Sequence, residues 1–288
     1  MTADGRATEP SSRPAAVVVI EEGVAVSRGM DAVAVEEPLE VRLGDRSLLV
    51  TMRTPGNDFD LVRGLLFTEG MVASPGDVTA VAHCRDVPDE ARGNVVTVGL
   101  APGVSLDEDR TPRAGIMSSA CGVCGKASLE ALADTCSPVG EGPVLRAEVL
   151  VGLPAAMHER QAVYASTGGL HAAALFDGSG RLLAFAEDIG RHNAVDKVIG
   201  QSLRFAAIPL HGTILMVSGR AGFEIVQKAR RAVIPVVCSV SAPSSLAVDV
   251  AVDGGQTLIG FLRGERFNIY AGAERLTDSP DPIEIDPR

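Results

Sequence analysis

From about residue 147 onward, short apolar segments alternate with amphipathic segments, and this alternation constrains the fold more than any other feature. The apolar segments have the length and the β-branched content of buried strands, and the intervening segments have helical spacing. We expect helices at 147–158, 193–203, 223–232 and 244–252, and strands at 163–166, 172–176, 182–186, 213–217, 236–240 and 257–261. Strands joined by single helices predict an α/β domain whose largely parallel sheet is covered on both faces.

The first half of the chain has a different pattern, with short strands separated by turns and one helix that starts near Asn57 and stops at Gly70. The expected strands there are 17–20, 32–35, 39–43, 47–52 and 95–100. A Pro- and Gly-rich linker at 137–143 separates the two halves. The resulting domain prediction is a disordered N-terminus at 1–15, a smaller mixed α+β domain at 16–136, an α/β domain at 144–275 and a tail at 276–288.

Composition limits the partners of such a chain. Asp and Glu total 37 against 26 Lys and Arg, which gives a formal net charge of −11 and argues against general binding to nucleic acid or to an anionic membrane. An anionic ligand must therefore be held by a local basic cluster. No apolar run approaches the roughly 18 residues of a membrane span, and the polar start does not resemble a signal peptide. We expect a cytoplasmic protein.

The chain has five cysteines, an odd number that argues against a disulfide framework in a protein without an export signal. Cys238 lies in an apolar run and is expected to be buried as a small hydrophobic residue. Cys84 and Cys136 have no partner at a meaningful spacing. Cys121 and Cys124 form a C-x-x-C pair and are the candidates for chemistry.

The C-x-x-C pair is flanked by Gly122 and Gly125 and followed by Lys126. This pattern predicts an exposed loop in which the positive charge of Lys126 favours the thiolate form of a cysteine. Two thiols at this spacing can form a disulfide, hold half of a metal site, act as nucleophile and resolving thiol, or be incidental. A structural zinc ion needs four ligands, and no other Cys or His has a suitable spacing, so zinc is the weaker alternative and we predict no metal.

Zinc deaminase chemistry is disfavoured by the residues around the histidines. Such a site needs His or Cys followed two positions later by a Glu, and later Pro-Cys-x-x-Cys. Neither His171 nor His192 has that Glu, and Cys121 follows Ala120 instead of a proline. The cysteine pair also precedes the α/β half instead of lying within it.

Polar loops interrupt the second half where strands are expected to end. These loops span 165–171, 187–193, 218–222 and 241–245. Their Gly and Ser residues let backbone amides approach an anion, and the carboxyl ends of parallel strands share one edge of a sheet. Arg191, Arg220, Arg263 and Arg266 lie in or near these loops and in the turn after the last strand. No loop matches a Walker or Rossmann pattern, so neither of those nucleotide sites is present. The four loops, two of which contain an Arg, indicate a phosphate-bearing ligand of another kind.

Lysine is scarce, because only three of the 26 basic residues are Lys. Lys126, Lys197 and Lys228 each adjoin the cysteine pair or a polar loop. The coincidence suggests positions where a compact ammonium is needed instead of a guanidinium.

Taken together, the motifs of this chain resemble the FdhD family, the formate dehydrogenase accessory sulfurtransferases, over about residues 37–270. They are Thr54-Pro-Gly-Asn-Asp58 with Thr68-Glu-Gly-Met71, Cys121-Gly-Val-Cys-Gly-Lys126, Thr167-Gly-Gly-Leu-His-Ala172, Asp188-Ile-Gly-Arg-His-Asn-Ala-Val-Asp-Lys197, Ser218-Gly-Arg220, Ser241-Ala-Pro243 and Phe261-Leu-Arg-Gly-Glu-Arg-Phe267. The resemblance implies a cytidine-deaminase-like, three-layer C-terminal domain and a homodimer.

The resemblance also implies a function. Such proteins take sulfur from a cysteine desulfurase as a persulfide and pass it to the bis(molybdopterin guanine dinucleotide) molybdenum cofactor, which GDP mimics, before insertion into the catalytic subunit of formate dehydrogenase. The implied carrier is Cys121, with Cys124 assisting and Lys126 stabilising the thiolate. A cofactor-binding chaperone without sulfur transfer, a dithiol redox protein and a structural zinc site are the alternatives.

The residues expected to bind the cofactor lie in the polar loops and in the segment 261–266. They are Gly168, Gly169, His171, Gly190, Arg191, His192, Ser218, Gly219, Arg220, Ser241, Phe261, Leu262, Arg263, Gly264, Glu265 and Arg266.

Overall fold

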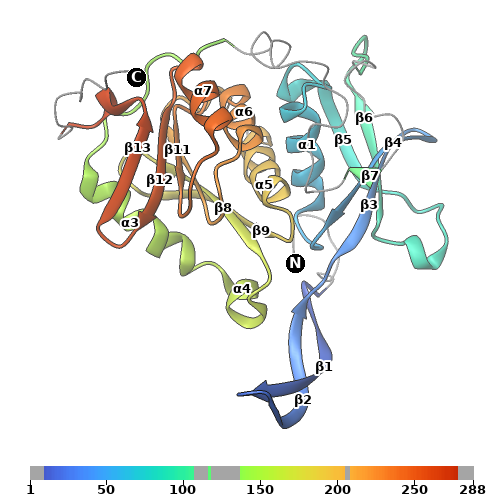
Figure 1. The fold of residues 1–288 in the computed structure, drawn as a ribbon. Coiled ribbons are helices and arrows are strands. Elements are labelled where there is room, and N and C mark those ends of the chain that lie inside the picture. Colours follow the sequence, from blue (N-terminus) through green and yellow to red (C-terminus); the bar gives the residue numbers. More distant parts are fainter. Residues whose placement is uncertain (1–9, 107–115, 118–136, 205–207, 278–288) are drawn as a thin grey trace.

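The computed structural model describes residues 10–106, 116–117, 137–204 and 208–277. Within these ranges the chain forms a five-stranded sheet, a six-stranded sheet and a separate two-stranded hairpin (Figure 1). None of the helices in these ranges has the length and apolar character needed to cross a membrane.

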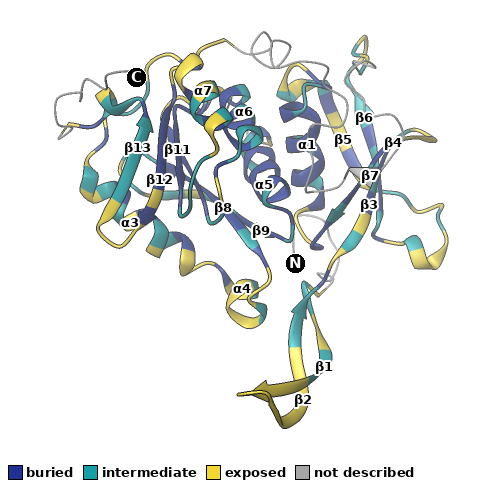
Figure 2. Ribbon diagram, viewed as in Figure 1, coloured by how far each residue is buried: buried dark blue, intermediate teal, exposed yellow. Residues whose placement is uncertain are grey.

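The five-stranded sheet comes from the first half of the chain and has the strand order β5-β6-β3-β4-β7. Its strands are β3 (Glu37–Leu43), β4 (Arg46–Arg53), β5 (Val78–His83), β6 (Val95–Leu100) and β7 (Ile116–Met117). Helix α1 (Asp58–Thr68) follows β4, and 3-10 turns lie at Pro75–Asp77 and Asp89–Ala91. Most of α1 is buried because it lies between this sheet and the second half of the molecule (Figure 2).

The six-stranded sheet has the order β13-β12-β11-β10-β8-β9. Its strands are β8 (His171–Asp177), β9 (Leu182–Asp188), β10 (Thr213–Val217), β11 (Val236–Ser239), β12 (Thr257–Arg263) and β13 (Arg266–Ala271). Only β10, β11 and β12 pair in parallel, so the expectation of a largely parallel sheet is wrong at both edges. Tight turns join β8 to β9 and β12 to β13, and a tight turn can only connect antiparallel strands.

Helices cover both faces of the six-stranded sheet, which confirms the α/β class. Helices α5 (Arg191–Leu203), α6 (Phe223–Arg231) and α7 (Ser245–Asp253) pack on one face and share its large apolar core with α1. Helix α3 (Ala147–His158) covers the other face over a smaller core, and a 3-10 turn follows β13 at Ala273–Arg275. The specifically cytidine-deaminase-like arrangement stays a prediction.

Residues 163–166, expected as a strand, lie instead in helix α4 (Ala162–Thr167). The carboxylate of Glu187 accepts hydrogen bonds from the backbone N–H groups of Val163 at 3.1 Å and Tyr164 at 2.8 Å. Gly168, with a left-handed φ of 66°, ends the helix. A carboxylate distant in sequence thus satisfies the free N–H groups of the first turn and overrides the local strand preference.

The two halves of the molecule meet where α1 crosses α5, a region that we call the junction. A Cβ atom on Gly64 would lie 1.8 Å from the backbone oxygen of Asp196, and one on Gly200 would lie 1.8 Å from the backbone oxygen of Asp60. The helices are therefore in backbone contact through reciprocal glycines, and no larger residue fits at either position.

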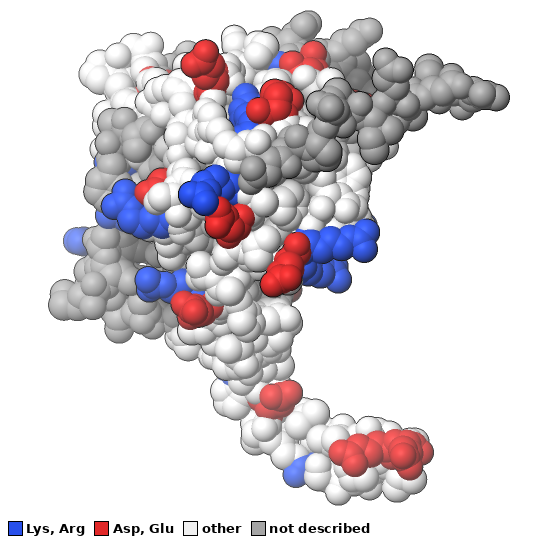
Figure 3. All heavy atoms as spheres, turned by 90° about the vertical axis from the view of Figure 1, so that its left-hand side faces the viewer, with Lys and Arg blue, Asp and Glu red and all other residues white. Residues whose placement is uncertain are grey.

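Strands β1 (Ser12–Glu21) and β2 (Val24–Ala34) form a hairpin that we call the arm. The arm projects from the body of the molecule, with acidic side chains at its far end (Figures 1 and 3). Because β1 begins at Ser12, the expected disorder is wrong for residues 12–15, and residues 1–9 lie outside the described ranges.

Candidate functional site

The predicted sulfur-carrying residues Cys121, Cys124 and Lys126 lie outside the described residues. Cys238, by contrast, is fully buried in β11, and its burial raises the pKa of the thiol well above its usual range. The burial confirms that Cys238 is a core residue. Cys84 is half-buried and free.

The predicted polar loops do meet at one edge of the six-stranded sheet, which we call the strand-end edge (residues 166–171, 188–193, 218–222, 241–245 and 261–266). Strands β9, β10, β11 and β12 end there, and the antiparallel β8 begins there. The N–H of Ala172 donates to Ser218 Oγ at 2.9 Å, and the N–H of Phe261 donates to the carbonyl of Ser241 at 3.1 Å. These bonds tie neighbouring loops to one another.

A cavity of about 570 Å³ opens at this edge, on the side covered by α3 and α4. Four predicted cofactor-binding residues, Gly168, Gly169, His171 and Ser218, line it. The other lining residues are Pro154, Met157, His158, Gln161, Tyr164, Leu170 and Val240. The sequence does not mark the wall made by α3 and α4, because 163–166 has the pattern of a strand and no motif covers residues 154–161.

The ring of His171 is half-buried at the start of β8, and Gly219 leaves room for it. A Cβ atom on Gly219 would lie 3.3 Å from His171 Nδ1. Burial, and then the positive charges of Arg191 and His192, lower the pKa of His171, while Asp188 opposes them. The imidazole is therefore mostly neutral at pH 7 and does not supply a positive charge to the cavity.

His192 and Glu224 connect the starts of α5 and α6, because His192 Nε2 lies 3.8 Å from Glu224 Oε2. The neighbouring imidazole of His192 holds the pKa of Glu224 below its usual value. This contact places residues 190–192 beside the loop that contains residues 218–220. Arg220 in that loop is exposed.

The segment 261–266 forms an exposed turn anchored by the fully buried side chain of Leu262. Arg263 Nε donates to the carbonyl of Val240 at 2.7 Å, next to the cavity. Phe261 has a left-handed φ of 53° and a 40% exposed side chain. An exposed aromatic residue in this strained conformation is the kind of feature found at ligand sites. Gly264, Glu265 and Arg266 complete the exposed turn.

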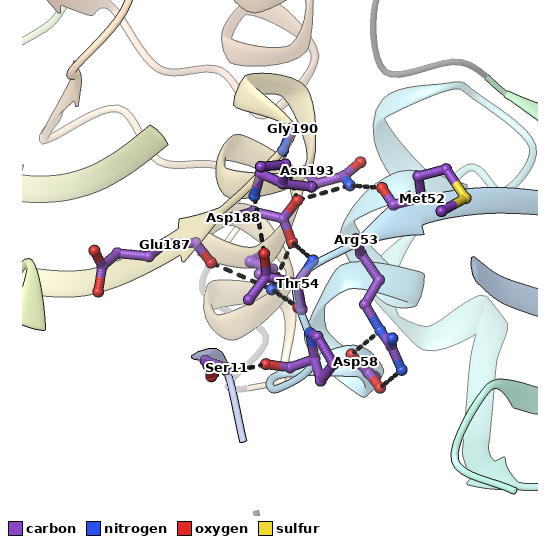
Figure 4. Close-up of polar contacts among 12 residues, drawn as sticks. Ser11, Met52, Arg53, Thr54, Asp58, Glu187, Asp188, Gly190 and Asn193 are labelled. Atoms are coloured by element: carbon purple, nitrogen blue, oxygen red, sulfur yellow. Dashed lines mark hydrogen bonds and ion pairs between the residues drawn. The ribbon is translucent and has the colours of Figure 1, made fainter. Parts of the chain in front are cut away.

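Buried polar contacts hold the loop 188–193 in place (Figure 4). The carboxylate of Asp188 accepts from the N–H of Gly190 at 2.8 Å, from Asn193 Nδ2 at 2.9 Å and from the N–H of Thr54 at 3.2 Å. It also pairs with Lys197 Nζ at 2.7 Å, and Lys197 donates to the carbonyl of Thr54 at 2.9 Å. Two motifs more than 130 residues apart in sequence thus form one network.

A second buried network lies farther along the junction. Lys228 Nζ contacts both carboxylate oxygens of Asp196 at 2.9 Å, Glu69 at 2.7 Å and Thr68 Oγ1 at 2.8 Å. Burial alone would lower the pKa of Lys228, but the charges of Asp196 and Glu69 outweigh it and raise that pKa. The two described lysines thus serve buried ion pairs of the junction and do not line the cavity. The buried ion pairs agree with the expectation that a compact ammonium is needed at Lys197 and Lys228.

A third buried cation fixes the start of α1. Arg53 is fully buried and donates through Nε and a terminal nitrogen to the two carboxylate oxygens of Asp58, at 3.1 and 3.0 Å (Figure 4). The same guanidinium reaches Asn94 Oδ1 at 2.9 Å. The Thr54–Asp58 motif is therefore part of the scaffold that supports the strand-end edge.

Among the described residues, no group of three or more His, Cys, Asp and Glu side chains could hold a metal ion. The zinc alternative depends on Cys121 and Cys124, which lie outside them, and so it stays open.

Comparisons with known proteins agree on one family. Residues 34–277 match the FdhD/NarQ family. A protein named sulfur carrier protein FdhD from Streptomyces coelicolor is 47% identical over 94% of this chain and 96% of its own length. A protein of the same name from Mycobacterium tuberculosis is 50% identical over 86% and 92%. A crystal structure described as a formate dehydrogenase accessory protein from Desulfotalea psychrophila aligns with a TM-score of 0.73 at 25% identity, covering 93% of this chain and all of the other.

Proposed function

Because this chain belongs to the FdhD/NarQ family, we propose that it carries sulfur for the maturation of a formate dehydrogenase. The names of its relatives and of the similar crystal structure support this role. The observation that carries the proposal is the convergence of glycine-, serine- and arginine-bearing loops around one open cavity at the strand-end edge.

In the proposed loading step, the Cys121 thiolate attacks the outer sulfur of a persulfide on a cysteine desulfurase. A new S–S bond forms on Cys121, the bond between the two donor sulfurs breaks, and the desulfurase leaves as a thiolate. Lys126, five residues along the chain, favours the attacking thiolate by its positive charge.

In the proposed unloading step, Cys124 attacks the inner sulfur of the Cys121 persulfide. A Cys121–Cys124 disulfide forms, and the outer sulfur departs as hydrosulfide toward the cofactor. A cellular thiol reductant then regenerates both thiols. In a variant of this scheme, Cys121 and Cys124 both carry the persulfide sulfur.

The proposed acceptor is the bis(molybdopterin guanine dinucleotide) molybdenum cofactor, bound as a substrate at the strand-end edge. The cavity, at about 570 Å³, is in the usual size range of small-molecule sites. Gly168 and Gly169 leave the cavity wall without side chains, and the guanidinium groups of Arg191, Arg220, Arg263 and Arg266 in the neighbouring loops add positive charge for phosphate oxygens. A local cluster of this kind lets a chain with a net charge of −11 bind an anion.

The proposal includes the finer features implied by the resemblance, namely a cytoplasmic location, the catalytic subunit of formate dehydrogenase as receiver, a homodimer and a cytidine-deaminase-like C-terminal domain. A mixed sheet with helices on both faces supports the last feature. Superposition of residues 144–275 on a solved cytidine deaminase tests it, because a different strand order in the deaminase would contradict it.

Mass spectrometry after incubation with desulfurase and cysteine tests the sulfur chemistry. We expect an added mass of about 32 Da per sulfur on the peptide that contains Cys121 and Cys124, and its loss in the Cys121→Ala variant. Cys238→Ala is the matched control, since its buried thiol is expected to take up no sulfur. Equal labelling of the Cys84 or Cys238 peptides would contradict the proposal.

A cofactor-binding chaperone is the second candidate, because the cavity wall in the described part of the chain supplies polar groups for a ligand but no thiol. Full support of formate dehydrogenase by a Cys121→Ala, Cys124→Ala double variant would favour the chaperone. Loss of support together with unchanged GDP binding would favour sulfur transfer.

A further inference from the structure

Helix α4 forms part of the cavity wall, yet little in its own sequence favours a helix. Its six residues, Ala162–Thr167, are fewer than an isolated helix needs, and Val163 and Thr167 are β-branched. None of the six is buried. The residue before it, Gln161, makes no capping hydrogen bond through its side chain and lines the cavity instead. The helix therefore depends on contacts from outside its own segment.

Glu187 supplies such a contact from β9. Its carboxylate accepts hydrogen bonds from the N–H groups of Val163 at 3.1 Å and Tyr164 at 2.8 Å. An ionised carboxylate has two acceptor oxygens and no donor proton, so it can bond to both N–H groups at once. One side chain thus satisfies two free N–H groups of the first turn of α4.

Glu187 and Asp188 are neighbours at the end of β9 and serve opposite faces of the sheet, because successive side chains of a strand alternate between faces. The carboxylate of Asp188 joins the buried network with Thr54 and Lys197, and the carboxylate of Glu187 points away from that network (Figure 4). The backbone carbonyl of Glu187 accepts from Lys197 Nζ at 3.3 Å. Glu187 therefore holds α4 from a point that the junction fixes.

The segment that Glu187 holds presents an aromatic ring and two glycines to the cavity. The side chain of Tyr164 is 38% exposed, and its ring lies edge-on to the ring of His158, with 6.4 Å between the centroids. Gly168 ends α4, and Gly169 follows it in the cavity wall. A displacement of α4 therefore moves Tyr164 and both glycines together and changes the shape of the cavity.

We propose that Glu187 is the positioning residue of this cavity, because its carboxylate holds the α4 wall in the shape that receives a nucleotide. The inference rests on the proposed function, in which the guanine nucleotide part of the cofactor is the ligand. Glu187 acts through Tyr164 and the glycines and not by contact with the ligand. A negative charge near a phosphate site opposes binding of the anion, so the contribution of Glu187 to affinity must come from geometry.

Isothermal titration calorimetry of the full chain with GDP tests this role. Glu187→Gln keeps one acceptor oxygen and Glu187→Leu keeps none, so we expect the affinity to fall about threefold and at least about tenfold, respectively. Removal of a negative charge alone would strengthen the binding of an anion, so a loss in this order reports position and not charge. Glu159→Gln, the same change at an exposed residue after α3, is the control and should bind GDP at least as tightly as the parent chain.

Amide hydrogen exchange followed by NMR shows whether the wall moves as a unit. The N–H groups of Ala165 and Gly168 bond to carbonyls within their own segment and not to Glu187. In Glu187→Leu we expect both to exchange at least about tenfold faster, with the urea midpoint of the chain unchanged. Faster exchange confined to Val163 and Tyr164 would overturn the proposal, since two bonds would then be lost without displacement of the wall.

The ring of Tyr164 provides a spectroscopic signature, because the chain has only two tyrosines. In a fluorotyrosine-labelled chain with Tyr270→Phe, the remaining fluorine NMR resonance belongs to Tyr164. We expect this resonance to shift in Glu187→Leu in the absence of ligand and to stay at the parent position in Glu159→Gln. An unchanged resonance in Glu187→Leu would contradict a displaced wall.

The outcomes separate this inference from the proposed function. Variants of Glu187 that bind GDP as tightly as the parent chain would overturn the inference. A parent chain that binds no GDP would contradict the proposed cofactor site, and the exchange of Ala165 and Gly168 would then decide whether Glu187 holds the wall. Sulfur loading depends on Cys121 and is expected to be equal in the parent chain and in Glu187→Leu.

Discussion

The junction and the strand-end edge are built from similar residues, yet they use them in opposite ways. At the junction, Lys197 and Lys228 are buried and pair with buried carboxylates. At the strand-end edge, Arg220, Arg263 and Arg266 are exposed. The same kind of charge therefore stabilises the scaffold where it is buried and paired, and is available to a ligand where it is exposed.

The largest loss of stability is expected when one partner of a buried ion pair at the junction is removed. Lys228→Ala leaves Asp196 buried without its cation, and we expect a loss of about 3–5 kcal/mol in the free energy of unfolding, measured by urea denaturation. Arg181→Ala is the control, because Arg181 pairs with Asp177 at the exposed β8–β9 turn, where such a pair contributes less than about 1 kcal/mol. Similar losses in the two variants would refute the contrast.

The backbone contact of the junction predicts the next largest effect. Gly200→Ala inserts a Cβ atom against the backbone of Asp60 and forces α1 and α5 apart, which should cost about 1–3 kcal/mol or more in the free energy of unfolding. Gly152→Ala, in α3 where the added atom meets nothing within 4 Å, should instead stabilise by about 0.5–1 kcal/mol. Thermal and urea unfolding of both variants measure this, and a stable Gly200→Ala protein would mean that the helices can separate.

Exposed arginines should affect binding and not stability. Arg220→Ala removes a charge from the strand-end edge, so we expect GDP binding to weaken about tenfold, with the free energy of unfolding unchanged within about 0.5 kcal/mol. Isothermal titration calorimetry measures the affinity. Arg92→Ala, an exposed arginine paired with Asp89 in the first half of the chain, is the control and should bind GDP as the parent does.

The smallest effect concerns His171. Its pKa is lowered below the ordinary 6.5 by burial, so the unfolded chain binds a proton more readily than the folded one. Stability contributed at this position is therefore present above pH 6.5 and decreases as the pH falls below it. An NMR titration of the imidazole should show a pKa under 6.5, and His171→Gln should remove this part of the pH dependence. A pKa above 6.5 would show that anionic groups dominate the site.

Sequence patterns located most elements of the six-stranded sheet and the loops that meet at its edge. They did not reveal that Asp188 organises the 188–193 loop, because its partners Thr54 and Asn193 belong to segments that no local spacing connects. They also missed the cavity wall from Met157 to Tyr164, because no chemical motif marks it.

By itself, the sequence determined the α/β alternation, the burial of Cys238 and the motifs of the family, since each of these is written in residues close together in the chain. Only the tertiary structure decided that 163–166 is helical, that the sheet edges are antiparallel and that two lysines belong to the junction. The physical reason is that burial, ion pairing and strand direction depend on partners distant in sequence. A local pattern records what a residue prefers, and the fold decides which partner it meets.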